Sequence, residues 1–253
     1  MPALLSRSSL PSLDEKPLPK IVFVTGTDTG VGKTVLTGLL LAYKQARGER
    51  VYAMKPFCSG DRADAELLYR LQRDELRLEE INPFFFEEPL APWVAARRLK
   101  RRAPDLGEVL EQIQVVARRL GPGGTLLIEG AGGLLVPLGN DYSVLDLIIA
   151  LRCDAIVVAS NKLGTINHTL LSVHAIECAR RGSVENRLRK TKVALMNRAQ
   201  AELSTASNPK VLSARLAPVP LLSLPFLGPK PSSFRAIRRH EKKLKKTLAR
   251  LLD

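Results

Sequence analysis

The sequence predicts an α/β fold with a mainly parallel central sheet and helices on both faces. Short apolar runs recur along the chain, and most are separated by segments with helical spacing. The runs are apolar at nearly every position, which is typical of parallel strands buried on both faces. They lie at residues 21–24, 51–54, 125–128, 155–159, 192–196 and 219–224.

The first of these strands leads into a glycine-rich loop, "VTGTDTGVGKT". Its glycines are followed by Lys33 and Thr34, a combination that a plain strand-to-helix turn does not require. In a phosphate-binding loop, glycines let backbone N–H groups converge on phosphate oxygens, the lysine meets the phosphates, and the next hydroxyl meets Mg²⁺. The following helix adds the positive end of its dipole. We therefore predict a P-loop nucleotide-binding fold, in a variant that has five residues between Gly26 and Gly32.

Polar residues follow the next strands, at the edge of the sheet where ligands collect in such folds. Lys55 and Ser59 follow the second strand, and Asp64 begins the helix after it. Glu129 ends the third strand, before a run of glycines, and Asn197 ends the fifth. A carboxylate beside a phosphate loop is a typical Mg²⁺ ligand, and an amide can pair with the edge of adenine. Taken singly, Lys55 could also be a surface charge and Glu129 a turn acceptor.

The fourth strand runs into "SNKLGTINHTLL", where a helix starts near Thr165–Asn167. This helix start could bind a carboxylate, or it could simply be a capped helix.

Composition limits the remaining classes of function. A chain of 253 residues accommodates one large α/β domain, and its three cysteines and three histidines lack the spacing of a disulfide framework or a zinc site. No apolar run is long enough to cross a membrane, and the first residues lack a signal-peptide core, so we expect a cytoplasmic protein. We divide the chain into a disordered extension (1–19), a nucleotide-binding domain (20–228) and a basic tail of the same domain (229–253).

The formal net charge of +14 raises the question of an anionic partner. Residues 235–253 carry eight Lys or Arg against Glu241 and Asp253, and four apolar residues at helical spacing, so they predict a basic amphipathic helix. A docked helix with a solvated basic face is favoured over binding to nucleic acid or a membrane. The charges are also not interleaved with aromatic residues, as they would be in a platform for single-stranded nucleic acid. We expect no membrane partner and disfavour nucleic acid.

Together these residues resemble the dethiobiotin synthetase family. The matching segments are "VTGTDTGVGKT", "MKPFCSG" with Asp64 shortly after, "NPFFFEEPLAPWVAARR", "IEGAGGLLVPL", "KLGTINHTLL", Asn197 and "LPFL", in the family's order over residues 21–228. The resemblance is specific because the five-residue loop spacing, the Lys-Pro pair and Glu-Gly-Ala-Gly-Gly occur together.

The resemblance implies an ATP-dependent enzyme that joins CO₂ or bicarbonate to 7,8-diaminononanoate and closes the ureido ring of dethiobiotin. One amine takes up CO₂ as a carbamate, the carbamate oxygen attacks the γ phosphate of ATP, and the second amine displaces phosphate. The family is homodimeric, with the substrate site at the interface. No protein nucleophile is needed, so catalysis would come from positioning and electrostatics.

The same resemblance implies the roles of individual residues. Lys33, Thr34 and Lys55 would be catalytic, and Mg²⁺ would be held by Thr34, Asp64 and Glu129. The substrate would contact Ser59, Thr29, Gly132, Leu163, Gly164, Thr165 and Asn167, the last four across the dimer interface. The nucleotide would contact Thr27, Asp28, Thr29, Gly30, Val31, Gly32, Lys33, Thr34, Asp64, Glu129, Asn197, Pro225 and Phe226.

Two features depart from the family. The loop from Ser59 to Asp64 is shorter than in familiar members, and the N-terminal extension and the basic tail are additions. The alternative is a partitioning-type P-loop ATPase switch that uses its basic tail to bind nucleic acid or membrane. Those proteins carry a signature lysine five positions before the loop lysine, where this chain has Asp28.

Overall fold

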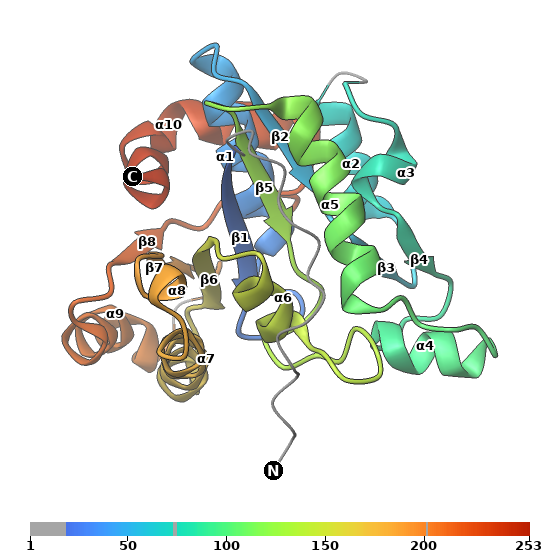
Figure 1. The fold of residues 1–253 in the computed structure, drawn as a ribbon. Helices are drawn as coiled ribbons and strands as arrows, with labels where there is room; N and C mark the ends of the chain where they lie inside the picture. The colour runs from blue at the N-terminus through green and yellow to red at the C-terminus, as the bar shows by residue number, and fades with distance from the viewer. Residues whose placement is uncertain (1–18, 73–74, 201) are drawn as a thin grey trace.

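A computed structural model of the chain describes residues 19–72, 75–200 and 202–253. The predicted disordered extension lies outside these residues, apart from Pro19. A six-stranded parallel sheet forms the centre, in the order β2-β5-β1-β6-β7-β8, and its strands confirm all six predicted ones (Figure 1). They are β1 (Lys20–Gly26), β2 (Val51–Met54), β5 (Thr125–Glu129), β6 (Asp154–Ser160), β7 (Thr191–Met196) and β8 (Leu221–Leu224).

Helices cover both faces of this sheet, as predicted (Figure 1). Helices α1 and α10 pack together on one face, while α5, α6, α7 and α9 lie on the other, as right-handed crossovers between parallel strands require. The helices are α1 (Lys33–Ala46), α2 (Ala63–Leu71), α3 (Leu78–Ile81), α4 (Pro92–Arg98), α5 (Leu106–Leu120), α6 (Val144–Ala150), α7 (Thr165–Arg180), α8 (Val184–Arg187), α9 (Leu203–Leu216) and α10 (Phe234–Leu252). No helix in the described part of the chain is both long enough and apolar enough to span a bilayer.

A second, two-stranded parallel sheet was not predicted. It pairs β3 (Phe57–Ser59) with β4 (Phe84–Phe86), and the rings of Phe57 and Phe84 stack with centroids 5.1 Å apart. Three-residue strands are too short to show a period in the sequence. This small sheet holds Ser59 beside the end of β2.

The basic C-terminal segment forms α10, which docks on α1 through buried apolar residues and exposes most of its cations. Its buried apolar side chains include Ile237, Leu244, Leu248 and Leu251. Three lysines also hold the end of the helix: Lys20 donates to the carbonyl of Leu252, Lys192 to that of Arg250 and Lys190 to that of Asp253. Cations at a helix C-terminus satisfy unpaired carbonyls and oppose the helix dipole.

The contact between α1 and α10 depends on Gly38. A Cβ atom built there would lie 3.1 Å from Leu71 Cδ1 and 3.3 Å from Ile237 Cδ1. We expect Gly38→Leu to lower the free energy of unfolding by about 1–3 kcal/mol through overpacking. Chemical denaturation would measure this loss. Gln112→Leu on the exposed face of α5 adds the same side chain where there is room, and an equal loss in that control would show that Gly38 has no special packing role.

Candidate functional site

The glycine-rich loop joins β1 to α1 and supplies unpaired amides. Gly32 takes the N-cap position of α1 with φ 104°, and no side chain caps this end of the helix. Gly30 also has a positive φ, of 67°. A non-glycine residue rarely adopts this backbone conformation, and a Cβ on Gly32 would lie 3.3 Å from Met196 Cε. The first N–H groups of α1 have no partner within the helix and lie at the positive end of its dipole, as an anion site requires.

The side chain of Lys33 is held by two backbone carbonyls, one of them in this loop. Its Nζ donates to the carbonyl of Asp28 at 2.8 Å and to that of Gly132 at 2.7 Å. Burial lowers the pKa of Lys33 to about 8, although Glu129 opposes the shift. Both recorded acceptors of this buried ammonium are neutral carbonyls, so the site favours an incoming anion.

Sheet register brings Lys55 and Glu129 together. Met54 of β2 pairs with Ile128 of β5, so the next residues, Lys55 after β2 and Glu129 at the end of β5, are neighbours. Lys55 Nζ lies 2.6 Å from Glu129 Oε1 and 2.6 Å from Asp64 Oδ2. Burial alone would lower the pKa of Lys55, but the charges of Glu129 and Asp64 outweigh burial and raise it. Burial likewise opposes ionisation of Asp64, but the charge and hydrogen bond of Lys55 outweigh it and lower the pKa of that carboxyl.

The carboxylate of Glu129 also ties this group to the glycine-rich loop. Thr34 Oγ1 donates to Glu129 Oε1 at 2.7 Å. The other oxygen, Oε2, is buried without a hydrogen-bond partner among the described residues. An orphaned carboxylate oxygen beside a hydroxyl and a second carboxylate is a set of hard oxygen donors, which fits Mg²⁺. Thr34, Asp64 and Glu129 could therefore hold this ion.

Two cavities meet at the loop. We call the first the catalytic cavity; it measures about 640 Å³ and brings together Thr29, Lys33, Thr34, Lys55, Ser59, Asp64, Glu129 and Gly132, all of which the sequence predicted as site residues. We call the second the base cavity; it measures about 420 Å³ and brings Gly30, Val31 and Gly32 together with Asn197, Pro225 and Phe226. Gly30 and Gly32 border both cavities.

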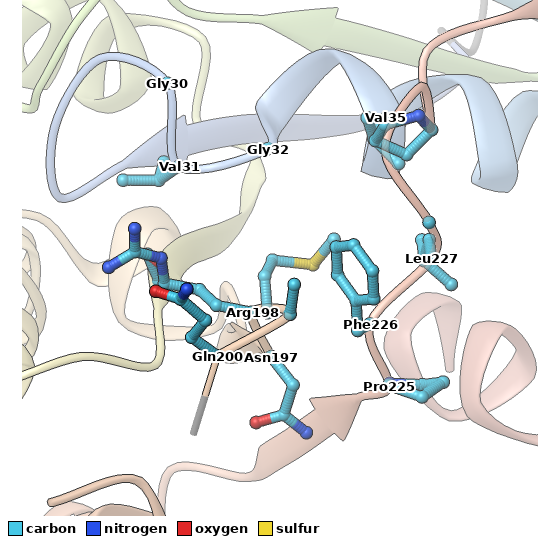
Figure 2. A pocket seen from close by; sticks show the side chains of 15 residues that line it. Gly30, Val31, Gly32, Val35, Asn197, Arg198, Gln200, Pro225, Phe226 and Leu227 are labelled. Atoms are coloured by element: carbon cyan, nitrogen blue, oxygen red, sulfur yellow. The ribbon is translucent and has the colours of Figure 1, made fainter. Parts of the chain in front are cut away.

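The base cavity has an apolar wall and a polar end (Figure 2). Phe226 and Leu227 come from the segment after β8 and face the loop that carries Gly30 and Gly32. The carboxamide of Asn197 is directed away from Phe226, and its Oδ1 accepts a hydrogen bond from Asn161 Nδ2 at 2.8 Å. An amide oxygen has two lone pairs. The side chain of Asn197 is therefore oriented by Asn161 and retains the capacity to pair with a base.

Some predicted residues do not line either cavity. Thr27 and Asp28 lie in the loop but border neither cavity. Leu163, Gly164, Thr165 and Asn167 likewise border neither. Thr165 and Asn167 lie in the first turn of α7, Gly164 takes its N-cap with φ 87°, and Leu163, just before it, is 78 % exposed. The structure of one chain therefore does not bring the predicted carboxylate-binding segment to the catalytic cavity.

Sequence reasoning also missed residues that line these cavities. In the base cavity they include Ser160, Met196, Arg198 and Gln200, which follow or end β6 and β7. Their positions at the carboxyl ends of predicted strands are a signal that could have identified them. In the catalytic cavity the missed residues include Cys58, Asp61, Pro89 and Ser232. Ser232 comes from the connection to α10, which no local pattern places near the loop.

Comparison with known proteins identifies the family. An AAA domain family model matches residues 20–225. The ATP-dependent dethiobiotin synthetase BioD of Anaeromyxobacter sp. strain K is 45 % identical over 165 residues, which are 64 % of this chain and 71 % of that relative. The chain belongs to the dethiobiotin synthetase family. The enzyme of the same name from Bacillus licheniformis is 44 % identical over 155 residues, 59 % of this chain, and that match spans 64 % of the relative's length, less than two thirds.

Solved structures place this dethiobiotin synthetase family member within a wider fold. The MinD cell division protein of Aquifex aeolicus superposes with a TM-score of 0.55 at 14 % identity, covering 92 % of this chain and 97 % of that one. A putative plasmid partition protein of Borrelia burgdorferi, solved with AMPPNP, gives 0.57 at 10 % identity, covering 92 % and 98 %. At such identities the likeness shows a shared fold, and it confirms the predicted P-loop architecture.

Proposed function

We propose that this chain is a dethiobiotin synthetase, which uses MgATP to carboxylate 7,8-diaminononanoate and close its ureido ring, releasing ADP and phosphate. The observation that carries the proposal is the position of Lys55. It lies in the catalytic cavity with the loop lysine Lys33, and it pairs with both carboxylates of the Mg²⁺-compatible set. Family membership supports the reaction, and the base cavity supports a nucleotide with its base beside Asn197.

Each residue then has a defined task. Lys33 and the loop amides would bind the β and γ phosphates, since Lys33 exchanges neutral carbonyl acceptors for anionic oxygens. Mg²⁺ held by Thr34, Asp64 and Glu129 would neutralise charge on the phosphates. Lys55 would stabilise the negative charge of the carbamate and of the phosphoryl group in transfer. Ser59, whose Oγ is buried without a hydrogen-bond partner among the described residues, would donate to the carbamate.

We also propose a homodimer in the cytoplasm. The segment Leu163–Asn167 would complete the substrate site of the partner subunit, because in its own chain it borders neither cavity. Exposed apolar side chains close to this segment in the fold support an interface there, since an isolated chain would leave them in water. They are Leu163 and Leu171, together with Leu203, whose neighbour Glu202 accepts a hydrogen bond from the amide of Leu163.

Product formation tests the reaction directly. The purified protein, incubated with MgATP, bicarbonate and 7,8-diaminononanoate, should form dethiobiotin in step with ADP, as measured by mass spectrometry and a coupled ADP assay. Omission of the diamine is the control and should suppress ADP release. ADP formed without dethiobiotin, or neither product from folded protein that binds ATP, would refute the proposed substrate.

A further inference from the structure

We infer that Asp61 binds an ammonium group of the diamine substrate and sets its affinity. This inference rests on the proposed function and adds a residue to its substrate site. Asp61 lies in the shortened loop between Ser59 and Asp64, and it lines the catalytic cavity with an exposed carboxylate.

Charge in the catalytic cavity is the first argument. Its wall carries Lys33, Lys55, Asp61, Asp64 and Glu129. Asp64 and Glu129 are both engaged by Lys55, and they are also the carboxylates of the Mg²⁺-compatible set. Asp61 has no lysine or arginine partner in the part of the chain that the structure describes; its recorded contact is with the amide of Ala63. Its negative charge therefore remains available to a ligand.

The substrate supplies the matching charge. An alkyl amine has a pKa near that of lysine, so a diamine carries at least one ammonium group near neutral pH. Lys33 and Lys55 in the same cavity repel that group, and the carboxylates that could attract it are already paired. An unpaired carboxylate on the cavity wall offsets the repulsion.

The loop holds Asp61 in place before any ligand binds. Gly60 donates its amide to the carbonyl of Phe86 at 3.0 Å and has φ 89°. A Cβ on Gly60 would lie 2.9 Å from Pro89 Cβ, so the loop packs directly on Pro89, another residue that lines the cavity. Asp61 Oδ1 accepts a hydrogen bond from the amide of Ala63 at 3.0 Å, at the start of α2. A carboxylate fixed in this way loses little conformational freedom on binding.

Asp61→Asn separates charge from structure, because asparagine keeps an oxygen that can accept the Ala63 amide. With MgATP and bicarbonate saturating, we expect the KM for the diamine to rise about fivefold, the scale of a solvent-accessible ion pair. We expect kcat and the KM for ATP to stay within about twofold, since Asp61 is not in the nucleotide or metal set. The KM of the unmodified protein should also rise with ionic strength, and that dependence should weaken in the variant.

Two further variants complete the test. Asp61→Glu keeps the charge and should recover part of the affinity. Glu66→Gln removes an equal charge from the exposed side of α2, outside the cavity, and should change neither constant. An unchanged diamine KM with an unchanged salt dependence in Asp61→Asn would overturn the inference while the proposed function stands. Equal increases in the KM for the diamine and the KM for ATP would assign Asp61 a structural role, and that result would also overturn the inference. Failure of the unmodified protein to make dethiobiotin would refute the proposed function, and this inference with it.

Discussion

Replacing Lys55 by alanine should reduce dethiobiotin formation by at least about 10²–10³-fold, the loss typical of removing one group that stabilises transition-state charge. The reason is its place in the cavity: Lys55 is 7 % exposed, and its ammonium lies 2.6 Å from Glu129 Oε1. Nucleotide affinity should change little, because Lys33 and the loop amides remain. Single-turnover product formation and ATP binding by calorimetry would measure the two effects separately.

The control for this variant is Lys246→Ala, which removes the same charge from the exposed face of α10. Removing the Lys55 ammonium leaves Glu129 as a buried charge without this cationic partner, which destabilises the fold. The melting temperature of Lys55→Ala should therefore be measured with and without MgATP. Loss of ATP binding together with turnover would contradict the role at the carbamate and would place Lys55 in the nucleotide site.

Replacing Glu129 by glutamine should raise the Mg²⁺ concentration needed for half-maximal rate by at least about tenfold. The carboxylate is enclosed, with its side chain 0 % exposed, and Oε2 is the orphaned oxygen of the Mg²⁺-compatible set. Glutamine keeps the size of the side chain and the acceptor for Thr34, but it removes the charge. A Mg²⁺ titration of product formation would measure the change.

Glu111→Gln on the exposed side of α5 provides the matched control and should leave the Mg²⁺ dependence unaltered. If Glu129→Gln lowers the maximal rate but leaves the half-saturating Mg²⁺ concentration unchanged, Glu129 acts by orienting Lys55 and Thr34. That outcome would remove Glu129 from the set of metal ligands.

The phosphate loop and the strands that carry the site could be predicted because their signals are local. Gly32, Lys33 and Thr34 are adjacent, and Lys55, Glu129 and Asn197 each follow an apolar run that is typical of a buried strand. Parallel strands then bring their carboxyl ends to one edge, so Lys55, Glu129 and Asn197 could be expected near the loop. The residues of β3 and β4 give no such signal, because each strand has three residues and gains its partner from a distant segment.

By itself, the sequence determined the strand order along the chain, the phosphate loop and its flanking helix, and the residues at the strand ends. These follow from side-chain spacing and from conformations that glycine permits, which act over a few residues. Only the tertiary structure decided that Thr34 and Lys55 share Glu129 Oε1 and that Lys55 also pairs with Asp64. It also decided that Asp61 has no cationic partner among the residues that the structure describes. Such pairings join residues as far as 95 positions apart, so they depend on sheet register and on burial of the whole domain.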